Sequence, residues 1–161
     1  IWMGLIGGAY VTHGECFCVD PDYYTGYAFL ATGGKFKGTS PARVKFTLSI
    51  LNALPATLRL ADQSWDTNTA SGGKGVYLRY FGHETPEEWN FELPARNGRF
   101  GRLQDGMKFK VEIIDTWNMT ITQYNETFTI KAKNKYRMVD ELGKSVKLPA
   151  KPYILLRITE I

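Results

Sequence analysis

The sequence predicts a mixed fold, in which a short α/β segment from the end of a (β/α)8 barrel is followed by an antiparallel β-sandwich. After about residue 75, apolar and polar residues alternate with a period of two, which is typical of strands that bury one face. Before residue 60, a short apolar segment, a polar loop and a helical pattern follow one another in the order of one barrel unit. The 161 residues are 43% hydrophobic, which is enough for a core.

Residues 1–60 are predicted to be the last strand, loop and helix of a TIM-like barrel. Ile1–Gly8 resembles the end of a buried helix, and Ala9–Thr12 is short and apolar, as buried parallel strands are. A second helix is expected to begin at Ser40, a good N-cap residue that is followed by proline, and to end before Pro55. The apolar face predicted for this helix consists of Val44, Leu48 and Leu51 and is widened by Phe46 and Ile50.

Residues 61–74 are predicted to be a linker, because small polar residues and glycine dominate them. From residue 75 to 161 we expect two packed antiparallel sheets. Val76–Phe81 carries large residues at both alternating positions, as a central strand does, and a turn is expected at Gln123–Asn125. Tyr153–Ile158 is expected to be the last strand. The residues expected in the core are Trp89, Phe91, Leu93, Phe109, Val111, Ile113, Phe128 and Ile130.

Composition argues against several classes of partner. The formal net charge is +4 with acidic and basic residues interspersed, so no nucleic-acid partner is predicted. No membrane is predicted either, because no apolar run approaches the roughly 18 residues of a membrane span. No cofactor is expected, since no phosphate-binding glycine loop is present and Cys16 and Cys18 have no further metal ligands around them.

The start of the chain predicts a piece of a longer protein, and a mature N-terminus left by processing is the alternative. Its first residue is isoleucine, and the apolar residues that follow have neither the basic flank nor the cleavage site of a signal peptide. The sequence leaves the location open, with the cytoplasm favoured over the periplasm or secretion.

The stretch Thr12–Glu15 is the first candidate site, because residues directly after a barrel strand line the active site. His13 and Glu15 are predicted to bind sugar hydroxyls or to tune a neighbouring carboxylate, together with Tyr10. A structural role, with a strand-end histidine and a surface glutamate, stays open. Tyr24 lies among further aromatic residues that form either a sugar-stacking platform or a loop held by its own apolar side chains.

The second candidate is Asp115–Thr120, which joins two predicted strands. Asp115 and Asn118 suit a turn, and Trp117 is expected either to form a structural corner or to pack against a neighbouring domain.

Four segments carry a resemblance to a known family: Gly7–Glu15, Lys37–Arg43, Asp115–Thr120 and Leu148–Tyr153. They resemble a family of bacterial proteins proposed to be glycoside hydrolases. These proteins have an N-terminal β-sandwich, a central apiosidase-like (β/α)8 barrel and a C-terminal β-sandwich.

The resemblance implies that this chain is the C-terminal part of such an enzyme. The two catalytic carboxylates of the barrel would then lie before residue 1, so this chain alone is expected to be inactive. His13, Glu15, Tyr10 and Tyr24 would be substrate-binding residues, and no catalytic residue is assigned. The expected partners are a carbohydrate substrate and the N-terminal remainder of the barrel, in the same or a partner chain.

Two other functions stay open. The chain is alternatively a non-catalytic module that binds carbohydrate or braces a barrel. A third possibility is a free-standing small α/β enzyme that uses His13, which would be active without any other chain.

Overall fold

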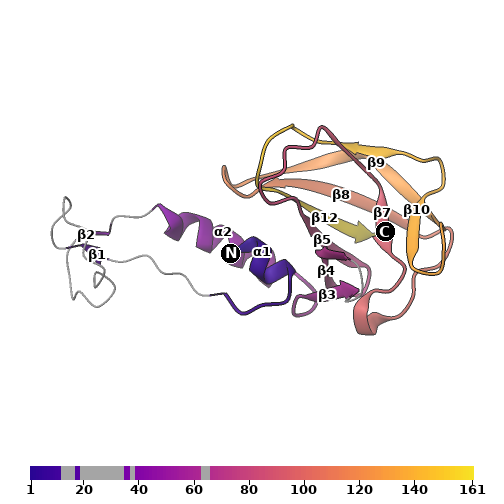
Figure 1. Cartoon of the computed structure of the whole chain (residues 1–161), viewed down its shortest axis with the longest axis horizontal. Coiled ribbons are helices and arrows are strands. Elements are labelled where there is room, and N and C mark those ends of the chain that lie inside the picture. Colours follow the sequence, from indigo (N-terminus) through magenta and orange to yellow (C-terminus); the bar gives the residue numbers. More distant parts are fainter. Residues whose placement is uncertain (12–16, 19–34, 37–38, 63–65) are drawn as a thin grey trace.

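The structure is a computed structural model that describes residues 1–11, 17–18, 35–36, 39–62 and 66–161. Antiparallel strands dominate it (Figure 1). The helical elements are α1 (Trp2–Ile6), α2 (Ser40–Asn52) and the short 3-10 helix η2 (Gly98–Phe100). The strands are β1 (Phe17–Cys18), β2 (Lys35–Phe36), β3 (Arg59–Asp62), β4 (Asp66–Gly73), β5 (Val76–Tyr80), β6 (Glu88–Asn90), β7 (Glu92–Pro94), β8 (Lys108–Asp115), β9 (Thr120–Ala132), β10 (Arg137–Asp140), β11 (Ser145–Lys147) and β12 (Ile154–Glu160).

Eight of these strands form one antiparallel sheet in the order β3-β4-β5-β12-β8-β9-β10-β7. The sheet curls until it is nearly closed, like a barrel with a gap between its edge strands β3 and β7 (Figure 1). Two further antiparallel pairs stand apart from it, β6 with β11 and β1 with β2.

The inner face of the curled sheet holds the main core. Alternate residues of β5, β8, β9 and β12 point inward, among them Tyr77, Phe109, Phe128 and Leu156, and all four are fully buried. Phe91 stacks on Phe128 with ring centroids 4.3 Å apart. Trp89 and Val146, on the β6–β11 pair, pack against the same core.

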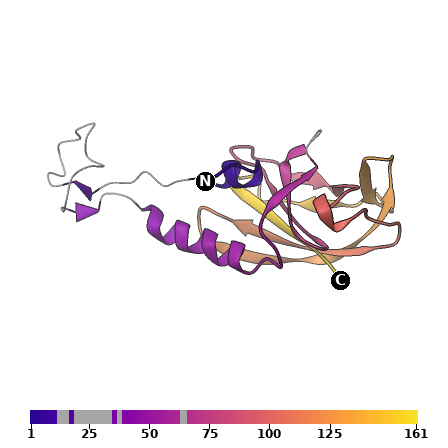
Figure 2. The ribbon, with the colours of Figure 1, turned by 90° about the horizontal axis from the view of Figure 1, so that it is seen from below.

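The outer face of the sheet is covered at one end by the two helices (Figure 2). Trp2 and Ile6 of α1 and Ile50 of α2 are buried against Leu78 of β5 and Leu155 of β12. β5 and β12 therefore bury both faces, which confirms that Val76–Phe81 is a central strand.

One hydrogen bond crosses the gap in the sheet. The buried Asn97 side chain, just after β7, donates its Nδ2 to the backbone oxygen of Gly73 at the end of β4, at 2.9 Å. Because a buried amide hydrogen bond fixes both partners, we infer that it sets how far the two sides of the sheet separate.

The expected fold class is wrong. No (β/α)8 segment is present in the described part of the chain, and the sandwich of two packed sheets is instead one nearly closed antiparallel sheet. Ala9–Thr12 is not a buried parallel strand: Ala9 and Tyr10 are exposed, and residues 9–11 belong to no strand. Alternation in a sequence shows that a strand buries one face, but it leaves open which strands pair.

Several local predictions also need correction. Residues 66–73 of the expected linker form β4, although the division into domains stays a prediction. No turn interrupts β9 at Gln123–Asn125, whose polar side chains lie on an exposed part of that long strand. Helix α2 begins at Ser40 as predicted, but its N-cap residue is Thr39, and Leu48 of the predicted apolar face is 51% exposed.

Most of the predicted core is confirmed. Phe91, Leu93, Phe109, Val111, Phe128 and Ile130 are buried, and Trp89 and Ile113 are partly buried. Within the described residues, no helix is long and apolar enough to cross a membrane.

Candidate functional site

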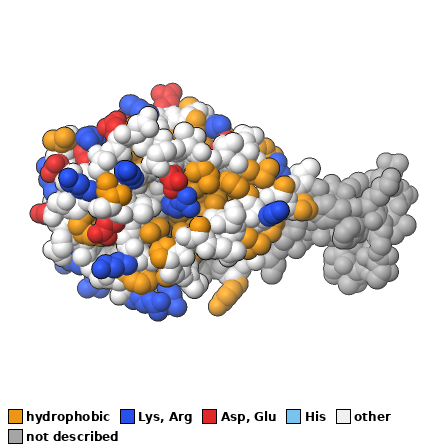
Figure 3. Space-filling model, turned by 180° about the vertical axis from the view of Figure 1, so that it is seen from behind, with side chains coloured by type: hydrophobic (Ala, Val, Ile, Leu, Met, Phe, Trp, Pro, Cys, Tyr) orange, Lys and Arg blue, Asp and Glu red, His pale blue; other side chains and the backbone are white. Residues whose placement is uncertain are grey.

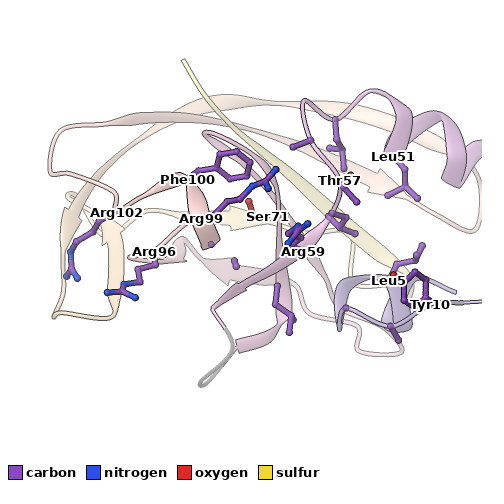
Figure 4. Close-up of a pocket in the computed structure, with 18 of the residues that line it drawn as sticks. Leu5, Tyr10, Leu51, Thr57, Arg59, Ser71, Arg96, Arg99, Phe100 and Arg102 are labelled. Atoms are coloured by element: carbon purple, nitrogen blue, oxygen red, sulfur yellow. The ribbon is translucent and has the colours of Figure 1, made fainter.

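An open groove of about 1500 Å³ runs along the gap in the sheet. One wall is β3 with the residues before it, and the other is the segment 96–102 that follows β7 (Figure 4). The end near α1 and the end of α2 is apolar and includes Leu5, Leu51 and Tyr10.

Positive charge dominates the rest of the groove. The basic residues that line it are Arg59, Arg96, Arg99, Arg102 and Lys135, and no Asp or Glu belongs to the described lining. None of these five side chains forms an ion pair with another described residue.

The segment 95–103 is a small hairpin that presents three of the arginines. Arg96 and Arg102 lie opposite each other across an antiparallel bridge, so their side chains leave the same face of the hairpin. The buried side chains of Ala95 and Leu103 anchor it, and their backbones are joined by a 2.9 Å hydrogen bond. At the tip, Gly98 takes a positive φ of 49°, a conformation that costs glycine little and allows the tight turn carrying Arg99.

Local contacts orient some of these cations. Arg102 donates its Nη2 to the backbone oxygen of Lys135 at 2.6 Å, which joins the hairpin to the β9–β10 turn. The Arg99 guanidinium lies 5.2 Å from the ring centroid of Phe100, and the Lys135 ammonium lies 4.8 Å from that of Tyr136. The groove therefore combines hydrogen-bond donors with exposed aromatic surface.

Of the residues predicted from the sequence to bind substrate, only Tyr10 can be placed. Its side chain is fully exposed and lines the apolar end of the groove (Figure 4). His13, Glu15 and Tyr24 lie outside the described residues.

Trp117, the other candidate, lies in the turn between β8 and β9. The Arg43 guanidinium of α2 lies 3.8 Å from its ring centroid, and the Tyr153 ring stacks on it at 5.4 Å. Arg43 also donates its Nε to the Trp117 backbone oxygen at 3.2 Å. Because Arg43 and Tyr153 of the same chain pack on this ring, we interpret Trp117 as a structural corner that holds α2 against the sheet. This agrees with the structural alternative given for Trp117.

Asp115 stabilises the turn that contains Trp117. Its carboxylate accepts hydrogen bonds from the backbone amides of Trp117 and Asn118, at 3.1 and 2.8 Å, and pairs with the Lys151 ammonium at 2.6 Å. Burial alone would raise the pKa of Asp115, but the hydrogen bonds from Asn118 and Lys151 lower it to about 2. The carboxylate is thus a buried structural anion rather than a proton donor at neutral pH.

The chemistry open to the groove is binding. Arginine supplies planar pairs of donors that match carboxylates, sulfates and phosphates. Cleavage of a glycosidic bond, by contrast, usually needs two carboxyl groups on either side of it. Nor do the described residues contain a group of three or more His, Cys, Asp or Glu side chains that could hold a metal ion.

Comparison with known protein families assigns this chain to one of them. The family described as "Domain of unknown function (DUF5605)" matches residues 65–159, which is more than half of the chain. The chain belongs to the DUF5605 family. The DUF5605 match begins at the start of β4 and ends within β12, so it covers most of the curled sheet and the whole 95–103 hairpin.

A solved structure resembles this DUF5605 chain over nearly its whole length. It is the crystal structure of a protein named a "putative glycoside hydrolase", from Bacteroides vulgatus ATCC 8482. The two are 44% identical with a TM-score of 0.86, and the match covers 98% of this chain but 30% of the other. The chain therefore spans less than a third of the length of that protein. No curated protein matches.

Sequence reasoning missed the basic groove altogether. Arg96, Arg99 and Arg102 recur every third residue around two glycines, which was the available signal. Arg59 is distant from them in the sequence, and only the curling of the sheet brings β3 opposite this hairpin.

Proposed function

We propose that this chain is a non-catalytic domain of a glycoside hydrolase and that it binds carbohydrate for a catalytic part located elsewhere in the protein. The observation that carries this proposal is the 44% identity, over 98% of the chain, to a much longer protein named a "putative glycoside hydrolase".

The geometry of the groove supports a binding role rather than a catalytic one. A retaining glycosidase needs two carboxyl groups about 5–5.5 Å apart, and an inverting one needs them about 6.5–9.5 Å apart. The described lining of the groove supplies arginine, lysine and aromatic side chains instead. Aromatic rings such as Tyr136, which is 50% exposed, offer flat apolar surface to the C–H faces of a sugar.

The finer arrangement of the complete enzyme is also part of the proposal. The catalytic carboxylates of the complete enzyme would lie in an apiosidase-like barrel, within the part of the relative that this chain does not match. This domain would follow the barrel on its C-terminal side. His13, Glu15 and Tyr24 would touch the sugar there, beside Tyr10. The support for these residues is the resemblance of Gly7–Glu15 to the family, since no strand of the described structure leads into them.

The test is to assay the Bacteroides relative and the isolated chain side by side on a panel of polysaccharides. Release of reducing sugar by the relative, with none released by the chain, is the expected result. Sugar release by the chain alone would show that it carries its own catalytic groups. A relative inactive on every polysaccharide would remove the enzymatic basis of the proposal.

A further inference from the structure

We propose that the groove between β3 and the 95–103 hairpin binds a polysaccharide that carries carboxylate groups, that is, one rich in uronic acid. This inference rests on the proposed function for its carbohydrate part, and on the charges of the groove for its acidic part. Arg59 and Arg99, which come from the two opposite walls, are assigned as its principal contacts (Figure 4).

The distribution of paired arginines singles out the groove. Outside it, three arginines pair with carboxylates of this chain: Arg79 with Asp66, Arg137 with Glu92, and Arg157 with Glu112. Arg43 covers Trp117 instead. The four arginines that line the groove have no carboxylate partner among the described residues. Since like charges that share one cleft repel each other, a set of unpaired cations in one place favours an anion from outside the chain.

The choice of carboxylate follows from the groups that surround the cations. Arginine binds a carboxylate through two parallel N–H donors, and exposed aromatic rings pack on pyranose C–H faces. Phe100 and Tyr136 stand directly beside Arg99 and Lys135. At these two points the groove lining places a cation beside an aromatic ring, which suits a sugar that carries an acidic group.

The size of the groove indicates a polymer rather than a single sugar. Small-molecule sites usually have volumes of about 300–1,000 Å³, and this groove, at about 1500 Å³, is larger and open. Its cations extend from Arg96 and Arg102 at one end to Arg59 and Arg99 near the middle (Figure 4). Several successive uronate units can thus be contacted at once. The competing occupant of the groove is an acidic surface on another part of a longer protein.

Calorimetric titration of the whole chain tests the inference, with polygalacturonate as the probe at low salt. Fully methyl-esterified polygalacturonate has the same sugar without the charge, and dextran sulfate tests whether any polyanion suffices. The double variant Arg59→Gln/Arg99→Gln removes one cation from each wall. The matched control is Lys108→Gln/Lys110→Gln, which removes the same charge from exposed residues of β8 outside the groove.

We expect polygalacturonate to bind, the methyl ester to bind at least about tenfold more weakly, and the groove variant to lose about tenfold or more in affinity. The control should keep its affinity within about twofold, and circular dichroism should show that both variants fold, because all four positions are exposed. Rising salt should weaken binding, since exposed ion pairs are screened.

Four results would overturn the inference. Equal binding of the methyl ester would show that charge is not recognised, and it would leave carbohydrate binding standing. Equal losses of affinity in the groove and control variants would show that binding depends on net charge alone. Tighter binding of dextran sulfate than of polygalacturonate would show the same. No binding of any probe would show that the groove does not take an acidic polysaccharide, whereas hydrolase activity of the longer relative would leave the enzymatic part of the proposed function standing.

Discussion

Asp115→Asn is the substitution whose effect can be worked most directly from the structure. The amide keeps the shape of the side chain, but it removes the negative charge that faces the Lys151 ammonium at 2.6 Å. In the wild type the Asn118 side-chain amide donates a hydrogen bond to the Asp115 carboxylate at 2.9 Å. The N–H donors of the new asparagine would face this donor. A pKa lowered from 3.8 to about 2 corresponds to about 2 kcal/mol of stability, at about 1.4 kcal/mol per pKa unit.

The lowered pKa of Asp115 also predicts how the free energy of unfolding depends on pH. Because the pKa of Asp115 is lower in the folded state, its contribution is complete above pH 3.8 and is lost as the pH falls toward 2. Urea unfolding should therefore show the wild type to be about 2 kcal/mol more stable than Asp115→Asn at pH 7. The difference should narrow progressively between pH 4 and pH 2.

Glu84→Gln is the control, since Glu84 is an exposed acid on the loop before β6. It should leave the free energy of unfolding unchanged at both ends of the pH range. A difference between wild type and Asp115→Asn that stays constant from pH 7 to pH 2 would refute the reasoning, because a lost hydrogen-bond acceptor alone has no such pH dependence.

Three further substitutions test other parts of the fold. Asn97→Ala breaks the hydrogen bond to Gly73 and should cost about 1–3 kcal/mol in urea unfolding, whereas an unchanged midpoint would mean that this bond does not hold the gap. Tyr77→Phe should be neutral or stabilise by about 1 kcal/mol, because the buried Tyr77 hydroxyl has no hydrogen-bond partner in the described structure; a loss above about 2 kcal/mol would reveal a partner. Arg43→Ala should speed amide hydrogen exchange in α2 while lowering global stability by about 1 kcal/mol or less, and unchanged exchange would show that the contact with Trp117 does not anchor the helix.

Strand β8 could be predicted because apolar and charged residues alternate strictly from Met107 to Ile113. Phe109 and Val111 on β8 point into the core as their spacing required, and Lys108 and Lys110, which alternate with them, are exposed. The same pattern could not show that eight strands join one curled sheet, because pairing is decided by contacts that are distant in sequence.

β4 was missed because its composition is that of a loop. Its Thr69 and Ser71 are buried, and the Thr69 hydroxyl donates to Asp66 at 2.7 Å, so polar residues satisfy one another inside the fold. Gly72 lies so close to Leu54 that a Cβ would come within 2.9 Å of that side chain. A close approach of the chain after α2, rather than a flexible linker, explains the glycine.

The basic groove was missed for a related reason, while the substrate-binding residues proposed from the sequence stay a prediction. Reasoning from barrel units drew attention to Tyr10, His13, Glu15 and Tyr24, and of these four only Tyr10 lies in the described part of the chain, at the rim of the groove. The cations of the groove come from β3 and from a hairpin beyond β7, and they become neighbours through the curl of the sheet.

The central claim is that this domain binds acidic carbohydrate without cleaving it, and one calorimetric titration addresses both halves. Injection of polygalacturonate into the wild-type chain should give heats that saturate, with the signal returning to baseline after each injection. Sustained heat flow after injection would mean turnover, and would contradict the assignment of catalysis to another part of the protein. The absence of any saturable heat would contradict the assignment of the groove as the binding site.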